Sequence, residues 1–183
     1  MSNNNNHPLG EAPLFHVLIS TGLGTGFFPW GPGTLAGAVA LAIWLLLYHL
    51  VTPISLVYIT FALISLTLII GIWTDNVMEK YWGEDPRTVV IDEFFGTWIA
   101  VTSALCCSST YETTIIAILS FALFRLIDIT KPLGCRWVDK NIHGGWGCML
   151  DDALAAFYAI VITLLIRYFN LIDLLPDYIK ELF

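Results

Sequence analysis

The stretch ISLVYITFALISLTLIIGIW, which runs from Ile54 to Trp73, contains no charged side chain. A helix that crosses about 30 Å of hydrocarbon needs about 20 predominantly apolar residues, and this stretch meets that requirement. Over the whole chain of 183 residues, 57% are hydrophobic and 13% are charged, whereas ordinary soluble domains carry about 25% charged residues. A very apolar soluble bundle is the alternative, but it would leave about 30% of its chain surface in water. The composition therefore predicts an all-α, multi-span membrane bundle.

Four further apolar stretches bring the expected number of spanning helices to about five, and they cover residues 35–51, 89–107, 113–129 and 148–168. Together they predict one membrane domain over residues 14–170. It is preceded by a flexible polar tail, 1–13, and followed by a tail, 171–183, that alternates apolar and charged residues. We expect this second tail to be an amphipathic helix on the membrane surface, with a frayed end as the alternative.

The basic residues predict the orientation of the bundle. Most of the eight Lys and Arg residues lie in or beside the links 75–88 and 130–147, namely Lys80, Arg87, Arg125, Lys131, Arg136 and Lys140. By the positive-inside rule these two links are cytoplasmic, so the N-terminus is cytoplasmic and the C-terminus lies outside. The net charge of −7 argues against a nucleic-acid partner. The four cysteines form no CxxC pair, so we expect neither a disulfide nor a zinc site.

Five carboxylates lie at the ends of the predicted spans on the cytoplasmic side, namely Asp92, Glu93, Asp128, Asp151 and Asp152. Each acid at membrane depth costs roughly 2.5–3.5 kcal/mol on insertion scales. Helix capping explains Asp92 and Asp151, which open helices, but it fails for Asp128, which closes one. It also leaves the doubled acids unexplained. A hard divalent cation, Mg²⁺, explains the convergence because it takes oxygen ligands and offsets their repulsion.

Basic side chains and glycines near these acids indicate an anionic ligand. Arg125 and Lys131 share one helix face with Asp128, so two cations accompany the carboxylate, although a local ladder of charge pairs is an alternative. In the segment NIHGGWG, Gly144 and Gly145 let a backbone approach an anion, and His143 is a candidate acid or base or a structural histidine. The segment TGLGTGFFPWGPGT, which ends at Thr34, is a loop that lines the site or a structural turn.

Four motifs in order resemble the phosphatidylglycerophosphatase A family. They are TGLGTGFFPWGPGT (21–34), VVIDEFFGTWIA (89–100), FRLIDITKP (124–132) and RWVDKNIHGGWGCMLDDALAA (136–156). The resemblance implies an all-helical, magnesium-dependent enzyme of the bacterial inner membrane. Such an enzyme removes the terminal phosphate of phosphatidylglycerophosphate, its lipid substrate, to give phosphatidylglycerol in phospholipid biosynthesis. It implies no obligate protein partner.

On this hypothesis the five acids supply the Mg²⁺ ligands or the base, and Asp128 and Asp152 are also catalytic. Lys131, and Arg125 beside it, neutralise the phosphate, while Asp139 or His143 protonates the leaving oxygen. The residues expected to contact the substrate are Arg125, Lys131, Gly144, Gly145 and Thr34. Water attacks phosphorus directly, with an aspartyl-phosphate intermediate as the rival chemistry.

Other functions remain open on the sequence. Another membrane lipid-phosphate phosphatase would use the same groups. A CDP-alcohol phosphotransferase also uses carboxylates at the membrane boundary, but its DG-x-x-AR signature is absent from the chain. A cation transporter would place its acids near the bilayer midplane, whereas these acids lie at helix ends.

Overall fold

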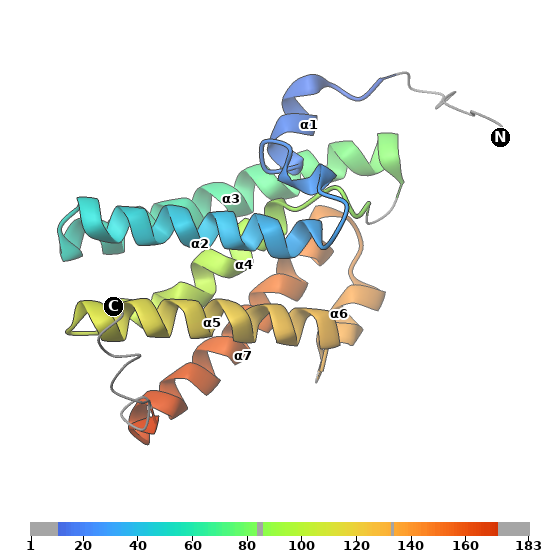
Figure 1. The fold of residues 1–183 in the computed structure, drawn as a ribbon. Coiled ribbons are helices and arrows are strands. Elements are labelled where there is room, and N and C mark those ends of the chain that lie inside the picture. Colours follow the sequence, from blue (N-terminus) through green and yellow to red (C-terminus); the bar gives the residue numbers. More distant parts are fainter. Residues whose placement is uncertain (1–10, 84–85, 133, 172–183) are drawn as a thin grey trace.

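The computed structural model describes residues 11–83, 86–132 and 134–171, and over these residues every regular element is a helix (Figure 1). The elements are α1 (Leu14–Ser20), the 3₁₀ helix η1 (Thr25–Phe27), α2 (Pro32–Leu50), α3 (Pro53–Trp82), α4 (Ile91–Ala100), the 3₁₀ helix η2 (Val101–Cys106), α5 (Thr110–Thr130), α6 (Cys135–Asn141) and α7 (Gly144–Tyr168). The predicted all-α class is confirmed. The two predicted tails fall almost wholly outside the described residues.

Four helices, α2, α3, α5 and α7, are long and apolar enough to cross a membrane. Their outer surfaces carry large apolar side chains, and on α3 these include Ile54, Tyr58, Phe61 and Ile69, each more than half exposed. Water would oppose this exposure, whereas lipid favours it. The described part of the chain therefore has the surface of a membrane protein.

The fifth expected span is not confirmed as a spanning helix. Residues 91–106 form α4 and then η2, which are together shorter than the other four candidates. In η2 the hydroxyls of Thr102 and Ser103 donate to the carbonyls three residues earlier, at 2.7 and 2.9 Å. Such local bonds compete with the α-helical pattern and accompany the tighter turn here.

Helix α4 is the central element of the fold, packed against α2, α3, α5 and α7 (Figure 1). Most of its side chains are buried, including those of Phe94, Phe95 and Trp98. A methyl group on Gly96 would overlap the ring of Phe124, so glycine allows α5 to approach α4 closely. The surrounding helices therefore hold the acidic start of α4 in a fixed position.

Two links expected from the sequence contain helix. Helix α3 does not end near Trp73, where the predicted span ends, but continues to Trp82. The next residue, Gly83, has a positive φ of 86°, which favours glycine. The link 130–147 contains α6, and α7 begins at Gly144 rather than near Cys148. Both changes bring polar residues onto ordered helices at one end of the bundle.

Candidate active site

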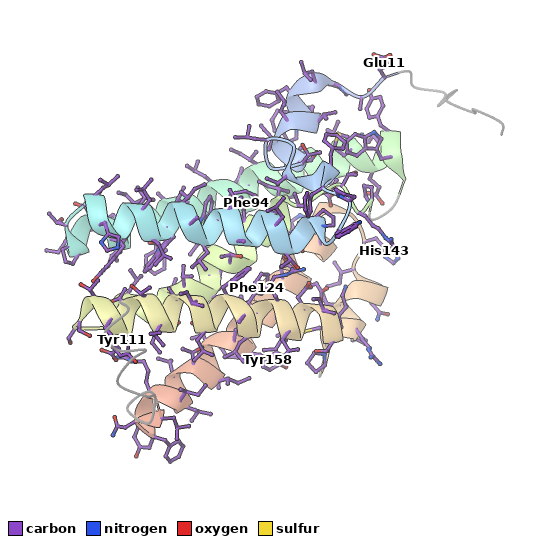
Figure 2. All side chains as sticks on the ribbon, viewed as in Figure 1. Glu11, Phe94, Tyr111, Phe124, His143 and Tyr158 are labelled. Atoms are coloured by element: carbon purple, nitrogen blue, oxygen red, sulfur yellow. The ribbon has the colours of Figure 1, made fainter. Side chains whose placement is uncertain are left out.

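One end of the bundle encloses a pocket of about 490 Å³. It is formed by the start of α2, the last part of α3, the start of α4, the end of α5, and the α6–α7 connection with the first turns of α7. Figure 2 shows His143 at this end, while Tyr111 lies at the opposite end of the bundle. The lining side chains that can carry charge are Asp75, Glu79, Arg87, Asp92, Glu93, Asp128, Lys131, His143, Asp151 and Asp152.

Three of these carboxylates converge on one point. Glu93, Asp128 and Asp152 each offer a carboxylate oxygen, and the three oxygens lie within 4.8 Å of one another. Asp152 is 3% exposed, and its Oδ2 has no hydrogen-bond partner among the described residues. A buried oxygen without a partner costs free energy unless a ligand meets it. All-oxygen donors with an unpartnered buried oxygen suit a hard divalent cation such as Mg²⁺.

Arg125 lies beside this group of three. Its Nη1 donates to Glu93 Oε2 and also to Asp128 Oδ2, the latter at 3.0 Å. Arg125 is absent from the residues that line the pocket. The guanidinium therefore neutralises and orients two carboxylates. The contact of Arg125 with a phosphate stays a prediction.

The other two predicted metal ligands have further partners. Asp151 Oδ2 forms a 2.6 Å ion pair with Lys131 Nζ. Asp92 accepts a hydrogen bond from the backbone N–H of Glu93 at 3.0 Å and another from Cys148 Sγ at 2.9 Å. Both acids line the pocket, but neither belongs to the group of three. The five predicted acids thus divide into one convergent group and two flanking residues.

Glycines at this end permit close packing. A methyl group on Gly33 would overlap Glu93 Oε1, so this glycine leaves room for the Glu93–Arg125 pair. Gly145 packs against the backbone of Ile72 and donates its N–H to Asn76 Oδ1 at 2.9 Å. Gly145 therefore joins α7 to α3 and is absent from the pocket lining, whereas Gly144 does line the pocket.

Of the remaining predicted site residues, His143 and Lys131 line the pocket and Thr34 does not. The side chain of Asp139 lies outside the described part of the chain.

All four cysteines are free, and burial raises the pKa of the Cys135 thiol, which keeps it protonated.

Sequence reasoning missed four polar residues that line the pocket, namely Asp75, Glu79, Arg87 and Cys148. Asp75 and Glu79 are four residues apart and share a face of α3. The signal that could have found Asp75 and Glu79 is Gly83, a helix stop ten residues beyond the predicted end of the apolar stretch.

A family model described as phosphatidylglycerophosphatase A matches residues 18–167. The chain belongs to the phosphatidylglycerophosphatase A family. The match covers all of the pocket-lining residues and, apart from Tyr168, the four spanning candidates. Family membership makes the chain a phosphatase and implies a lipid substrate.

Curated relatives support the phosphatidylglycerophosphatase A assignment over most of the chain. A Bacteroides thetaiotaomicron protein named "Putative phosphatidylinositol-3-phosphatase" is 43% identical over 152 residues, which cover 83% of this chain and 93% of that protein. Phosphatidylglycerophosphatase A of Escherichia coli is 35% identical and covers 83% of this chain and 81% of its own length. The Haemophilus influenzae protein of that name is 33% identical, with coverage of 91% and 98%. No solved structure matches the chain.

Proposed function

We propose that this protein hydrolyses the terminal phosphate of phosphatidylglycerophosphate, with Mg²⁺, to give phosphatidylglycerol and phosphate in phospholipid biosynthesis. The observation that carries the proposal is the convergence of Glu93, Asp128 and Asp152 in a pocket of a family phosphatase. A cation between these carboxylates would face a phosphate group that enters the same pocket.

Each residue near the group of three has a part in this proposal. Glu93, Asp128 and Asp152 would hold the Mg²⁺, which when bound supplies positive charge to the phosphate oxygens. Arg125 keeps Glu93 and Asp128 in place through its two ion pairs. Lys131 reaches the pocket from the end of α5 and binds a phosphate oxygen, with Asp151 fixing its ammonium group.

Hydrolysis requires a water to attack phosphorus while the bond to the glycerol oxygen breaks. A pocket carboxylate accepts the proton of that water, and Asp92 flanks the group of three in a position to do so. His143, at the rim of the pocket, donates a proton to the leaving glycerol oxygen. A rival chemistry forms an aspartyl-phosphate first, and acid-quench trapping of ³²P-labelled protein distinguishes the two, because only the rival chemistry labels the chain.

The activity test uses purified protein in detergent with phosphatidylglycerophosphate. We expect release of inorganic phosphate with Mg²⁺ and loss of that release when a chelator removes the metal. Absence of release with every divalent metal would overturn the proposal. Replacing Asp128 by Asn (Asp128→Asn) should remove most of the turnover, and Glu112→Gln at the opposite end of the bundle is the matched control.

A second candidate substrate comes from the relative at 43% identity, which is named for phosphatidylinositol 3-phosphate. That lipid also joins a phosphomonoester to a phosphodiester through a polyol. The same assay with both lipids decides between them. A kcat/KM for phosphatidylinositol 3-phosphate that is tenfold higher would favour the second candidate.

We further propose that the protein lies in the bacterial inner membrane with the pocket at the cytoplasmic face, and that the α4–η2 segment completes a fifth crossing. The excess of Lys and Arg at the pocket end supports this orientation. In a variant whose four native cysteines are replaced by serine, a single cysteine introduced by Trp137→Cys, at an exposed position of α6, should react with an impermeant maleimide only after the cells are opened. Labelling of Trp137→Cys in intact cells would show that the pocket end faces outward and would overturn the proposed orientation.

A further inference from the structure

The pocket is strongly acidic for a site that accepts a lipid phosphate. Seven carboxylates line it, while the fixed cations among its described lining residues are Lys131 and Arg87. Lys131, which pairs with Asp151, is already assigned to the terminal phosphate in the proposed function. Arg87 forms no ion pair with a described residue, and its side chain is exposed at the pocket. The guanidinium of Arg87 is thus available to bind a second anionic group of the substrate.

The backbone around Arg87 is held firmly. The N–H of Val89 donates to the carbonyl of Pro86 at 2.8 Å and closes a turn around Arg87. The N–H of Val90 donates to the carbonyl of Ser20 at 2.7 Å, which joins this turn to the segment after α1. The turn therefore presents the arginine from a fixed place beside the start of α4.

The glycine-rich segment contributes to the same fixation. A methyl group on Gly26 would overlap the carbonyl oxygen of Thr88, so only glycine allows η1 to pack against this turn. Most of the residues of this segment do not line the pocket, and those that do are Pro32 and Gly33. One function of the segment is thus to support the chain that carries Arg87.

We propose that Arg87 binds the phosphodiester of the lipid substrate and so makes the pocket selective for lipids with two phosphates. The inference rests on the proposed hydrolysis of phosphatidylglycerophosphate, whose terminal phosphomonoester would bind Lys131 and the cation that the group of three would hold. The phosphodiester then lies one glycerol away, toward the acyl chains. Arg87 lines the same pocket as the group of three, and a guanidinium provides paired donors for phosphate oxygens.

The test compares two lipids that differ in the second phosphate. Phosphatidic acid has a phosphomonoester and no phosphodiester, whereas phosphatidylglycerophosphate has both. Arg87→Gln should lower kcat/KM for phosphatidylglycerophosphate about tenfold more than for phosphatidic acid, mainly through KM, because a hydrogen bond to a charged group is lost. Arg87→Lys should recover part of this loss. An equal change for the two lipids, or no change in KM, would overturn the proposal.

A matched control excludes general attraction between the protein surface and anionic lipid. Arg136 is an exposed cation at the same end of the bundle, and it does not line the pocket. Arg136→Gln should therefore leave the ratio of the two kcat/KM values unchanged. A parallel change in that ratio for Arg136→Gln would assign the effect to surface charge and would overturn the role of Arg87.

Product inhibition provides a second measurement, which does not depend on turnover of phosphatidic acid. Phosphatidylglycerol retains the phosphodiester alone, so it should inhibit the wild-type enzyme and should inhibit Arg87→Gln about tenfold more weakly. Equal inhibition of the two proteins would refute the subsite even if hydrolysis of phosphatidylglycerophosphate is confirmed. If the wild-type enzyme acts instead on phosphatidylinositol 3-phosphate, the proposed function fails, and the comparison is repeated with that lipid and phosphatidylinositol.

Discussion

Replacing Asp152 by Asn keeps the shape of the side chain and removes one charge from the group of three carboxylates. The carboxylate oxygens of the group lie within 4.8 Å of one another, and two unit charges at that limit repel by about 3.5 kcal/mol at an effective dielectric constant of about 20. Asp152 has two such neighbours, Glu93 and Asp128, and Arg125 offsets part of the repulsion because it pairs with both. We therefore expect Asp152→Asn to stabilise the metal-free protein by roughly 1–3 kcal/mol.

The same substitution should abolish phosphate release, because the metal loses a ligand. The assay is thermal unfolding of the purified protein in detergent, with chelator and with Mg²⁺. Wild-type protein should gain stability with Mg²⁺, and Asp152→Asn should start from a higher midpoint and gain little. Glu112→Gln, which breaks the 2.9 Å ion pair with Arg167 at the opposite end, should keep the wild-type response to Mg²⁺. A lower midpoint for Asp152→Asn in chelator, or a full response to Mg²⁺, would refute the reasoning.

Two further predictions concern packing. Gly33→Ala places a methyl group on Glu93 Oε1, so Glu93 must move and the Mg²⁺ concentration for half-maximal activity should rise several-fold; an unchanged metal titration would contradict this contact. Trp44→Phe removes the buried 2.9 Å hydrogen bond from Trp44 Nε1 to Thr60 Oγ1 and should lower stability by about 1–3 kcal/mol. The pocket is remote from this pair, so activity below the unfolding midpoint should persist, and its loss would show that the pair has a wider role.

The helical fold could be predicted from the sequence because lipid imposes a simple rule on length and polarity. The stretch 54–73 has no charge, and it lies in a helix that is long and apolar enough to span. The stretch 89–107 met the same rule less well. In the structure its α-helical part, α4, packs against α2, α3, α5 and α7, and most of its side chains are buried. An apolar stretch in a sequence can therefore indicate burial inside the bundle as well as contact with lipid.

Counting the predicted helices was enough to place the acids at one end of the bundle. It could not predict which of the acids converge and which lie beside them. Glu93, Asp128 and Asp152 converge, but Asp151 turns to Lys131. Neighbouring residues 151 and 152 differ because successive positions on a helix point about 100° apart, and the rotation of α7 against α5 decides which one faces the group. That rotation depends on packing contacts such as Gly145 against Ile72, which the sequence of one helix does not reveal.

The length of α3 has a consequence for how the enzyme meets its substrate. Thirty residues extend for about 45 Å, whereas the hydrocarbon layer measures about 30 Å. We expect the last turns, which carry Asp75 and Glu79, to stand among the lipid head groups, so the pocket opens at the depth where a phosphate naturally lies. The lipid then reaches the enzyme by diffusing within its leaflet. The rate of turnover should follow the mole fraction of the substrate lipid in the bilayer rather than the bulk concentration of that lipid. Dilution of the substrate with inert lipid should therefore slow the reaction.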